Sequence, residues 1–179
     1  RVTRAVPDGG PIEAHTDLVK KLDYECELAV VLGRDARDVP AGQTRDYIFG
    51  YTILNDVSAR DVQTAHKQWY FGKSLDGFTP IGPCIVTADA FADYPPRLGI
   101  RSFVNGEKRQ DSNTALQIFD IDHVIAELSQ GMTLKAGTII ATGTPAGVGM
   151  GMDPPQFLKP GDVVRCEIEG IGTLTNPVK

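Results

Sequence analysis

Hydrophobic and polar positions fall into short runs along the chain, and most of these runs have the length of a β-strand. Residues 24–32 (YECELAVVL) are polar on one side at their start and apolar throughout their second half, which predicts a strand. Residues 47–55 (YIFGYTILN) are rich in aromatic and β-branched side chains and predict a second strand. Further strands are predicted at 83–88, 98–104, 138–142, 163–168 and 172–174. We expect the strand at 138–142 to be buried.

Helical spacing occurs in two short segments. Residues 57–66 predict a helix with Asp56 near its N-terminus. Residues 121–130 have apolar positions at helical spacing, with Gly131 as the expected C-cap. Asn105-Gly106 follows the strand at 98–104 and predicts a tight hairpin turn. The strands do not alternate regularly with helices, so we expect an α+β fold dominated by β-structure.

The chain divides into an arm and one domain. Residues 1–22 are polar and punctuated by Pro and Gly, which favours a loop or arm, and residues 23–179 form the expected domain. A length of 179 residues fits one domain with a substantial core. The chain begins at Arg1 rather than Met, and we expect a further N-terminal portion upstream.

Composition argues against several classes of partner. The net charge of −5 and the pI near 5.1 argue against nucleic-acid and anionic-membrane partners, since either would favour a basic face. Apolar runs such as 28–32 are too short to cross a bilayer. Cys26, Cys84 and Cys166 are odd in number and lack a CxxC pair, which favours reduced thiols and a cytoplasmic location.

Glu25 and Glu27 lie two residues apart in the first predicted strand, so both carboxylates point to the same face. Tyr24, Cys26 and Leu28 point to the opposite face. Two carboxylates beside an apolar run repel each other and resist desolvation, and a hard divalent cation such as Mg²⁺ or Mn²⁺ would relieve both effects. A solvated strand face at a sheet edge is the alternative interpretation.

Asp56 ends the second predicted strand, close to further polar side chains. Arg60 and Gln63 lie three residues apart on one face of the predicted helix, and Arg60 lies four residues from Asp56. A carboxylate, a guanidinium and an amide thus converge where the strand passes into the helix. A helix cap at Asp56 or a surface ion pair between Asp56 and Arg60 is the structural alternative.

Two glycine-rich segments resemble nucleotide-binding motifs, but each lacks a feature that its motif requires. Gly72-Lys73-Ser74 lacks the first glycine of a phosphate loop, because Lys67 stands at that position. Lys73 is better interpreted as a cation in a loop that can approach a ligand. Residues 142–151 follow a strand without opening a helix, so they make a poor dinucleotide fingerprint. His66 and His123 are interpreted as helix-surface residues.

Together these segments resemble the fumarylacetoacetate hydrolase family. The similarity extends from residue 22 to the C-terminal end, with several motifs in the family's order and spacing. The matching stretches are LDYECELAVVLG (22–33), FGYTILNDVSARDVQ (49–63), FGKSLDGFTPIGP (71–83), VNGEKRQDSNT (104–114), GMTLKAGTIIATGTPAGVGMG (131–151) and LKPGDVVRCEIEGIGTLTNPV (158–178).

The resemblance implies a mixed β-roll, a homodimer and a bound Mg²⁺, with Mn²⁺ or Ca²⁺ as further candidates. The family's metal-binding carboxylates match Glu25, Glu27 and Asp56. The family positions that contact the substrate's carboxylate and oxo oxygens match Arg60, Gln63, Lys73 and Thr144. Many members also use a His and a Glu upstream of the metal-binding strand for proton transfer, and Glu13 and His15 do not match that pair.

The expected substrate is a small anionic 2-oxo acid. It would chelate the metal through its carboxylate and 2-oxo oxygens, and the metal would stabilise an enolate. Arg60 and Lys73 are the candidate catalytic residues, because they would offset the substrate's negative charge. The leading hypothesis is C–C bond cleavage, as in acylpyruvate and fumarylpyruvate hydrolases or oxaloacetate decarboxylases. The alternatives are a 2-hydroxyhepta-2,4-diene-1,7-dioate isomerase-type tautomerase and a non-catalytic metal-binding relative.

Overall fold

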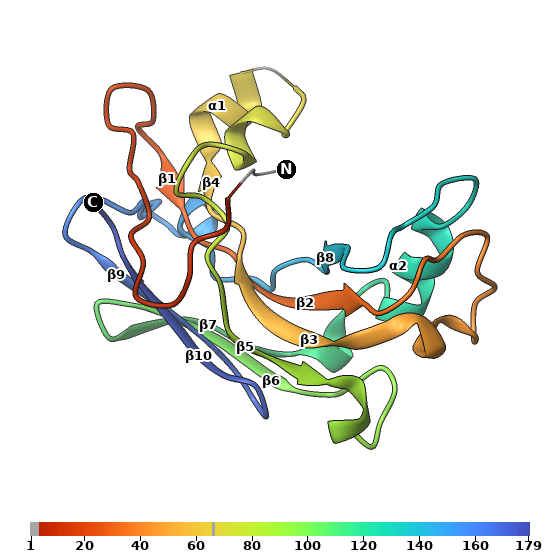
Figure 1. Ribbon diagram of the computed structural model, residues 1–179. Helices are drawn as coiled ribbons and strands as arrows, with labels where there is room; N and C mark the ends of the chain where they lie inside the picture. The colour runs from red at the N-terminus through yellow and green to blue at the C-terminus, as the bar shows by residue number, and fades with distance from the viewer. Residues whose placement is uncertain (1–3, 66) are drawn as a thin grey trace.

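Antiparallel sheets dominate the computed structural model, which describes residues 4–65 and 67–179 (Figure 1). One four-stranded sheet has the order β5-β3-β2-β8. Its strands are β2 (Cys26–Leu32), β3 (Ile48–Asn55), β5 (Ile81–Thr87) and β8 (Ile139–Ala141). The other four-stranded sheet has the order β10-β9-β6-β7. Its strands are β6 (Gly99–Val104), β7 (Glu107–Asn113), β9 (Val163–Ile168) and β10 (Gly172–Pro177).

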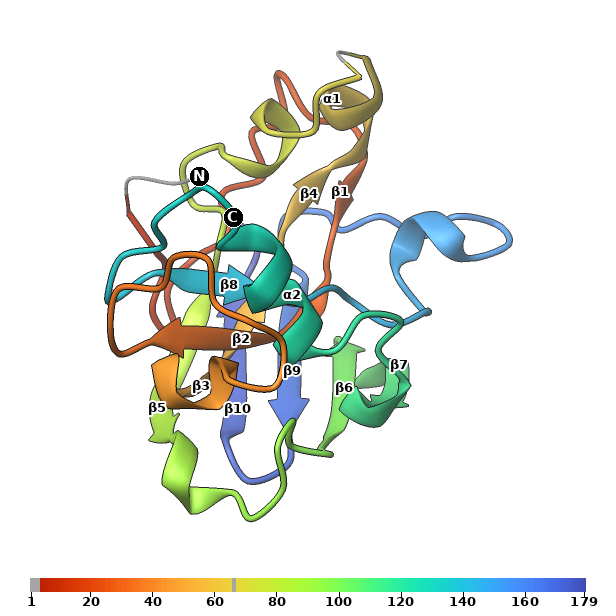
Figure 2. The same ribbon diagram turned by 90° about the vertical axis from the view of Figure 1, so that its right-hand side faces the viewer.

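The remaining elements are short. A two-stranded antiparallel sheet joins β1 (Leu22–Asp23) to β4 (Ser58–Ala59), and β4 leads up into α1 (Arg60–Ala65) in Figure 2. The second helix, α2 (Ile121–Leu128), contacts the short 3₁₀ turn η1 (Thr44–Tyr47). Short 3₁₀ turns include η2 (Phe71–Lys73) and η5 (Gly149–Gly151). The expectation of a β-dominated α+β fold is confirmed.

The strand β2 is an interior strand of its sheet, because β3 and β8 pair with its two edges, and all its residues are buried. Leu28 and Val30 on one of its faces belong to a core shared with the second sheet. Val164 and Leu174 belong to the same core and are at most 1% exposed. This core holds the two sheets together.

The predicted hairpin is confirmed. The strands β6 and β7 pair on either side of Asn105-Gly106, and Val104 lies opposite Glu107. Both turn residues have left-handed backbone conformations, with φ of 53° and 86°. Asn and Gly tolerate this conformation better than other residues, which explains why the dipeptide predicts the turn.

The helix predicted at 57–66 begins later than expected. Ser58 and Ala59 form β4 and pair with β1, and the backbone N–H of Arg60 donates to the carbonyl of Lys21 at 2.8 Å. Pairing with a distant strand therefore uses backbone groups that the helix would need, and the helix begins at Arg60. Asp56 accordingly does not cap this helix. The prediction for His66 lies outside the described residues.

Two other predictions differ from the structure. The strand β8 lies at a sheet edge, so Ile140 is buried whereas Ile139 is 47% exposed, and the expectation of a buried strand is wrong. The helix α2 has its C-cap at Ser129 rather than Gly131, which takes a φ of 66° two residues later. His123 is exposed on α2, as expected.

Residues 4–21 contact the last strand and bury some of their apolar side chains in the core. The backbone N–H of Ile12 donates to the carbonyl of Pro177 at 2.8 Å, and Ile12 is fully buried in the core. The division of the chain at residue 22 stays a prediction. Within residues 4–65 and 67–179, the structure has no helix that is long and apolar enough to cross a bilayer.

Candidate functional site

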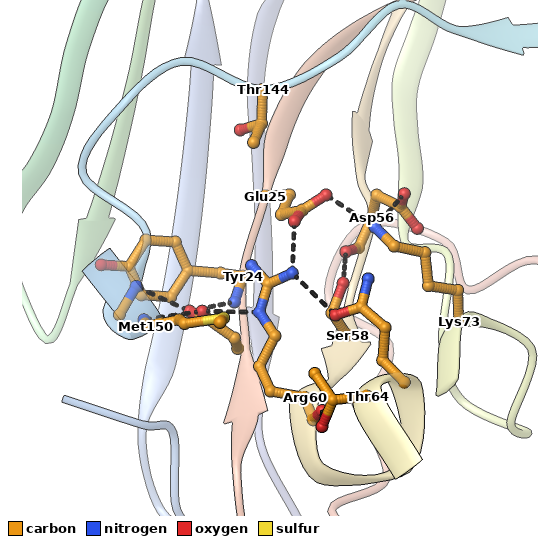
Figure 3. Close-up of polar contacts among 12 residues, drawn as sticks. Tyr24, Glu25, Asp56, Ser58, Arg60, Thr64, Lys73, Thr144 and Met150 are labelled. Carbon is orange, nitrogen blue, oxygen red and sulfur yellow. Dashed lines mark hydrogen bonds and ion pairs between the residues drawn. The ribbon is translucent and has the colours of Figure 1, made fainter. Parts of the chain in front are cut away.

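One pocket of about 1120 Å³ brings together the side chains that the sequence singles out. It lies where β2 begins, β3 ends, and α1, η2 and the segment after β8 approach one another (Figure 3). All the predicted metal-binding and substrate-binding residues line it, namely Glu25, Glu27, Asp56, Arg60, Gln63, Lys73 and Thr144. Residues far apart in the sequence thus share one cavity.

Glu25 and Glu27 point into this pocket from the start of β2. Glu25 is 8% and Glu27 is 3% exposed, which is incompatible with the alternative of a solvated strand face. Tyr24, Cys26 and Leu28 belong to the core on the opposite face, as the alternation predicts. The carboxylates are therefore held in an environment that strongly disfavours uncompensated charge.

Asp56 is fixed beside Glu25 by the end of β3. Its backbone N–H donates to the carbonyl of Glu25 at 2.8 Å, and the side chain of Asn55 accepts from the backbone N–H of Glu25 at 3.0 Å. One carboxylate oxygen from each of Glu25, Glu27 and Asp56 lies within 4.8 Å of the other two. These three oxygens form a compact, buried acidic cluster.

Lys73 lies against this cluster. Its Nζ donates to Glu25 Oε2 and to Asp56 Oδ2, both at 2.7 Å (Figure 3). A Cβ added at Gly72 would lie 2.7 Å from the backbone nitrogen of Gln63. The glycine therefore allows η2 to pack closely against α1, and this close packing carries Lys73 into the pocket.

Arg60 enters the pocket from the first turn of α1. Its guanidinium NH1 lies 2.7 Å from Glu25 Oε1 and donates to Gln63 Oε1 at 3.3 Å. The side chains of Arg60 and Asp56 are 7% and 8% exposed. Arg60 therefore belongs to a buried network, and the alternative of a surface ion pair with Asp56 is wrong.

Thr144 closes the opposite side of the pocket, in the segment after β8. The backbone N–H of Gly143 donates to Glu27 Oε2 at 2.8 Å, and Thr144 Oγ1 donates to the carbonyl of Cys26 at 2.9 Å. Gly143 has a φ of 100°, a conformation that glycine adopts readily. The segment leads into a turn rather than a helix, and Gly143 forms part of the pocket wall.

The sequence interpretation missed two buried residues that support the site. Asp23 accepts a hydrogen bond from Arg60 Nε at 3.0 Å, and Gln110 Nε2 donates to Thr144 Oγ1 at 2.8 Å. Gln110 Oε1 also accepts from the backbone N–H of Cys26 at 3.1 Å. Asp23 continues the alternating acidic pattern of 25 and 27, a signal that could have found it. Gln110 lies on β7 and carries no such signal.

Burial and charge shape the electrostatics of the site. Burial, followed by the Asp56 charge, raises the pKa of Glu27 to about 8, although the Gly143 N–H opposes the shift. Burial alone would lower the pKa of Arg60, but the charges of Glu25 and Asp23 raise it above its ordinary value. When all are ionised, the carboxylates Asp23, Glu25, Glu27 and Asp56 exceed the cations Arg60 and Lys73 by two charges.

This donor set fits a divalent cation. Three carboxylate oxygens offer the hard ligands that Mg²⁺, Mn²⁺ and Ca²⁺ prefer, and the cluster contains neither the thiolate nor the imidazole typical of zinc sites. A divalent ion would also offset the two excess negative charges that the six ionised side chains of the site carry together. Glu25, Glu27 and Asp56 are the residues that would hold it.

Comparison with known proteins indicates one protein family. The model of the fumarylacetoacetate (FAA) hydrolase C-terminal family matches residues 1–179. The oxaloacetate tautomerase YisK of Bacillus subtilis is 47% identical over 170 residues, which are 95% of this chain and 56% of that protein. The chain thus spans little more than half the length of this curated relative.

Solved structures have the same fold. The fumarylacetoacetate hydrolase EaFAH of Exiguobacterium antarcticum is 52% identical with a TM-score of 0.93, and the match covers 97% of this chain and 62% of that one. A 2-hydroxyhepta-2,4-diene-1,7-dioate isomerase of Mycobacterium marinum is 45% identical with a TM-score of 0.85, covering 96% of this chain and 64% of that one.

Proposed function

The chain belongs to the fumarylacetoacetate hydrolase family, and from this premise we propose that it catalyses the interconversion of the oxo and enol forms of a small 2-oxo acid with the help of a divalent cation. The observation that carries the proposal is the buried cluster of Glu25, Glu27 and Asp56 facing Arg60 and Lys73 in one pocket. A cluster of this kind suits an anionic substrate that presents two oxygens to a metal ion.

The three carboxylates would hold the cation, with Mg²⁺ as the first candidate and Mn²⁺ or Ca²⁺ as alternatives. When bound, the ion supplies a Lewis acid for the carboxylate and 2-oxo oxygens of the substrate and favours its enolate. Lys73 keeps Glu25 and Asp56 oriented through its two hydrogen bonds of 2.7 Å. The chain therefore pre-orders two of the three ligands.

Four side chains are proposed to bind the substrate. Arg60 carries a planar, permanently charged guanidinium that can bind a carboxylate through two hydrogen bonds. Lys73 adds a second positive charge at the same end of the pocket, and both cations would stabilise the negative charge that develops in an enolate. Gln63 and Thr144 line the pocket beside them and offer polar groups to the substrate's oxygens.

Two of the relatives support an isomerisation without bond cleavage. One is named as an oxaloacetate tautomerase and another as a 2-hydroxyhepta-2,4-diene-1,7-dioate isomerase. Oxo–enol interconversion moves a proton and a double bond, and it needs nothing from the pocket beyond binding, charge stabilisation and proton transfer. Cleavage of a C–C bond passes through the same enolate and additionally requires a leaving fragment.

Cleavage of a C–C bond remains the second candidate. The specific observation in its favour is the 52% identity to a structure named fumarylacetoacetate hydrolase. Both reactions would use the same cluster and cations. They differ in their products, so NMR of the products formed from oxaloacetate and from an acylpyruvate separates them.

The proposed role of the cluster is tested with Glu25→Ala and Asp56→Ala, assayed on oxaloacetate and acylpyruvates with added Mg²⁺. Each change removes a ligand and leaves Lys73 with one fewer carboxylate, so we expect metal-dependent turnover to fall by at least about a hundredfold. Asp162→Asn changes a buried carboxyl outside the pocket and serves as the control. Unchanged metal-dependent turnover in both alanine variants would overturn the proposal.

A further inference from the structure

Asp23 is a fully buried carboxylate at the end of β1, outside the lining of the pocket. Its Oδ1 accepts from the backbone N–H groups of Tyr24 at 2.9 Å and Gly149 at 2.8 Å. Its Oδ2 accepts from the backbone N–H of Met150 at 2.9 Å and from Arg60 Nε at 3.0 Å. Both oxygens are therefore saturated by donors from three separate segments.

This carboxylate holds one edge of the Arg60 guanidinium. Asp23 binds Nε, whereas NH1 is directed at Glu25 Oε1 and Gln63 Oε1 (Figure 3). Contacts on two different edges of a planar group fix both its position and the orientation of its plane. Glu25, which lines the pocket, contacts the guanidinium from inside it, whereas Asp23 lies outside the pocket lining.

The same carboxylate also fixes the turn η5. A Cβ at Gly149 would lie 2.8 Å from Asp23 Oδ1 and 2.0 Å from the carbonyl oxygen of Gln156, so the turn packs closely against Asp23. Met150, the next residue, lines the pocket. Asp23 therefore connects Arg60 with Met150, two residues of the pocket lining that come from different segments.

We infer that Asp23 is a positioning residue that acts through Arg60, holding its guanidinium in the orientation that binds the substrate's carboxylate; this inference rests on the proposed function. Without the Asp23 contact, Glu25 is the remaining acidic partner that the structure gives Arg60. The arginine would then turn toward Glu25. Glu25 would compete with the substrate's carboxylate for Arg60, and Arg60 would compete with the metal ion for Glu25. Small misplacements of a binding group have large effects on catalysis.

The first test uses steady-state kinetics of Asp23→Asn, which keeps the shape of the side chain and removes its charge. We expect KM for oxaloacetate to rise by about tenfold or more, with a smaller change in kcat. If Asp23 acts through Arg60, the double variant Asp23→Asn/Arg60→Ala will bind substrate no more weakly than Arg60→Ala alone. Additive effects, or an unchanged KM, would overturn the inference.

The second test is independent of catalysis. The ¹H–¹⁵N signal of Arg60 Nε, assigned by its loss in Arg60→Lys, reports the contact with Asp23 directly. We expect slow solvent exchange of this proton in the natural protein and exchange faster by about tenfold or more in Asp23→Asn, because a buried charged hydrogen bond protects it. Exchange at the same rate would overturn the inference even where the proposed reaction is confirmed.

Two controls separate positioning from general stability. Asp162→Asn alters another buried carboxyl that accepts a backbone N–H, that of Lys159 at 2.9 Å, and should lower Tm without raising KM. If Asp23→Asn fails to fold, Asp23→Ser retains an acceptor for the Gly149 N–H and is measured instead. Should Arg60→Ala leave KM unchanged while Nε exchange still depends on Asp23, the proposed role of Arg60 fails and the positioning contact stands.

Discussion

Burial of the Glu27 side chain favours its protonated form in the metal-free site. Its pKa lies at about 8 because the carboxyl is desolvated and faces the Asp56 charge. Metal binding requires the ionised carboxylate and so releases a proton. Below pH 8, metal affinity should therefore rise with pH, by at most about tenfold per pH unit for one proton, and should level off above it.

This pH dependence is measured by titrating Mn²⁺ into the protein between pH 6 and pH 9 by calorimetry. Glu27→Gln removes both the ligand and the titrating group. Its affinity should be weaker and nearly independent of pH over the same range. A flat affinity profile in the natural protein would contradict the assignment of Glu27 as a ligand that must lose a proton.

The raised pKa of Glu27 also affects folding stability without metal. A carboxyl whose pKa rises from 4.5 to about 8 on folding binds its proton more tightly in the folded state. Its contribution to stability is complete below pH 4.5 and is lost as the pH rises toward 8. The free energy of unfolding of Glu27→Gln, measured with urea, should therefore fall less over this range than that of the natural protein.

At the scale of single residues, the sequence predicts the pocket's polar lining better than its support. Three signals together predict the residues that line the pocket. They are the alternation at 25 and 27, the acidic residue Asp56 at the end of a strand, and the resemblance to the family. The role of Gln110 depends on contacts with Cys26 and Thr144, which lie on other elements. Such contacts exist only after the sheets have assembled, and no local pattern encodes them.

At the scale of elements, the segment after β8 requires a glycine at position 147. Gly147 has a φ of 107°, and a Cβ there would lie 2.2 Å from the carbonyl oxygen of Arg109. Gly147→Ala should lower the free energy of unfolding by about 3 kcal/mol or more. Gly137→Ala is the matched control, because its φ is 83° with no atom within 4 Å, and it should cost about 1–2 kcal/mol.

Urea unfolding of both glycine variants checks this prediction. Equal losses would mean that backbone conformation alone sets the effect and that close packing against β7 adds nothing. A larger loss at Gly147 would support close packing between this segment and the second sheet.

Strand positions were predictable because their apolar runs are intrinsic to the sequence. The strand β9 occupies Val163–Ile168, as predicted, whereas β10 continues to Pro177 beyond the predicted 172–174. The start of α1 was not predictable in the same way. Pairing of β4 with β1 takes up backbone groups that a helix at 57–59 would use, and this competition depends on tertiary structure.

At the scale of the whole molecule, the core between the sheets should set global stability. Leu174 on β10 is fully buried in this core, whereas Leu116 is 75% exposed. Leu174→Ala should lower the free energy of unfolding by about 2–5 kcal/mol, because it leaves a cavity. Leu116→Ala, the same chemical change at the surface, should alter it by about 0.5 kcal/mol or less. Similar losses in the two variants, measured with urea, would contradict this view of the core.

The class of fold follows from the sequence more securely than the reaction does. Short apolar runs without regular helices predict a β-dominated domain, and the structure confirms it. Isomerisation and C–C cleavage share an enolate, so the same pocket residues suit both. The choice between them depends on the substrate's distal group and on proton transfer, which the lining residues do not determine.

The most direct test of the central claim follows the C3 protons of oxaloacetate by ¹H NMR in D₂O with added Mg²⁺. Enzymatic interconversion of the oxo and enol forms replaces these protons with deuterium whether or not a C–C bond breaks. We predict exchange faster than in the enzyme-free control with the same Mg²⁺, dependent on the metal ion and reduced to the enzyme-free rate in Glu25→Ala. Exchange at the enzyme-free rate, or exchange that persists unchanged in Glu25→Ala, would contradict the account.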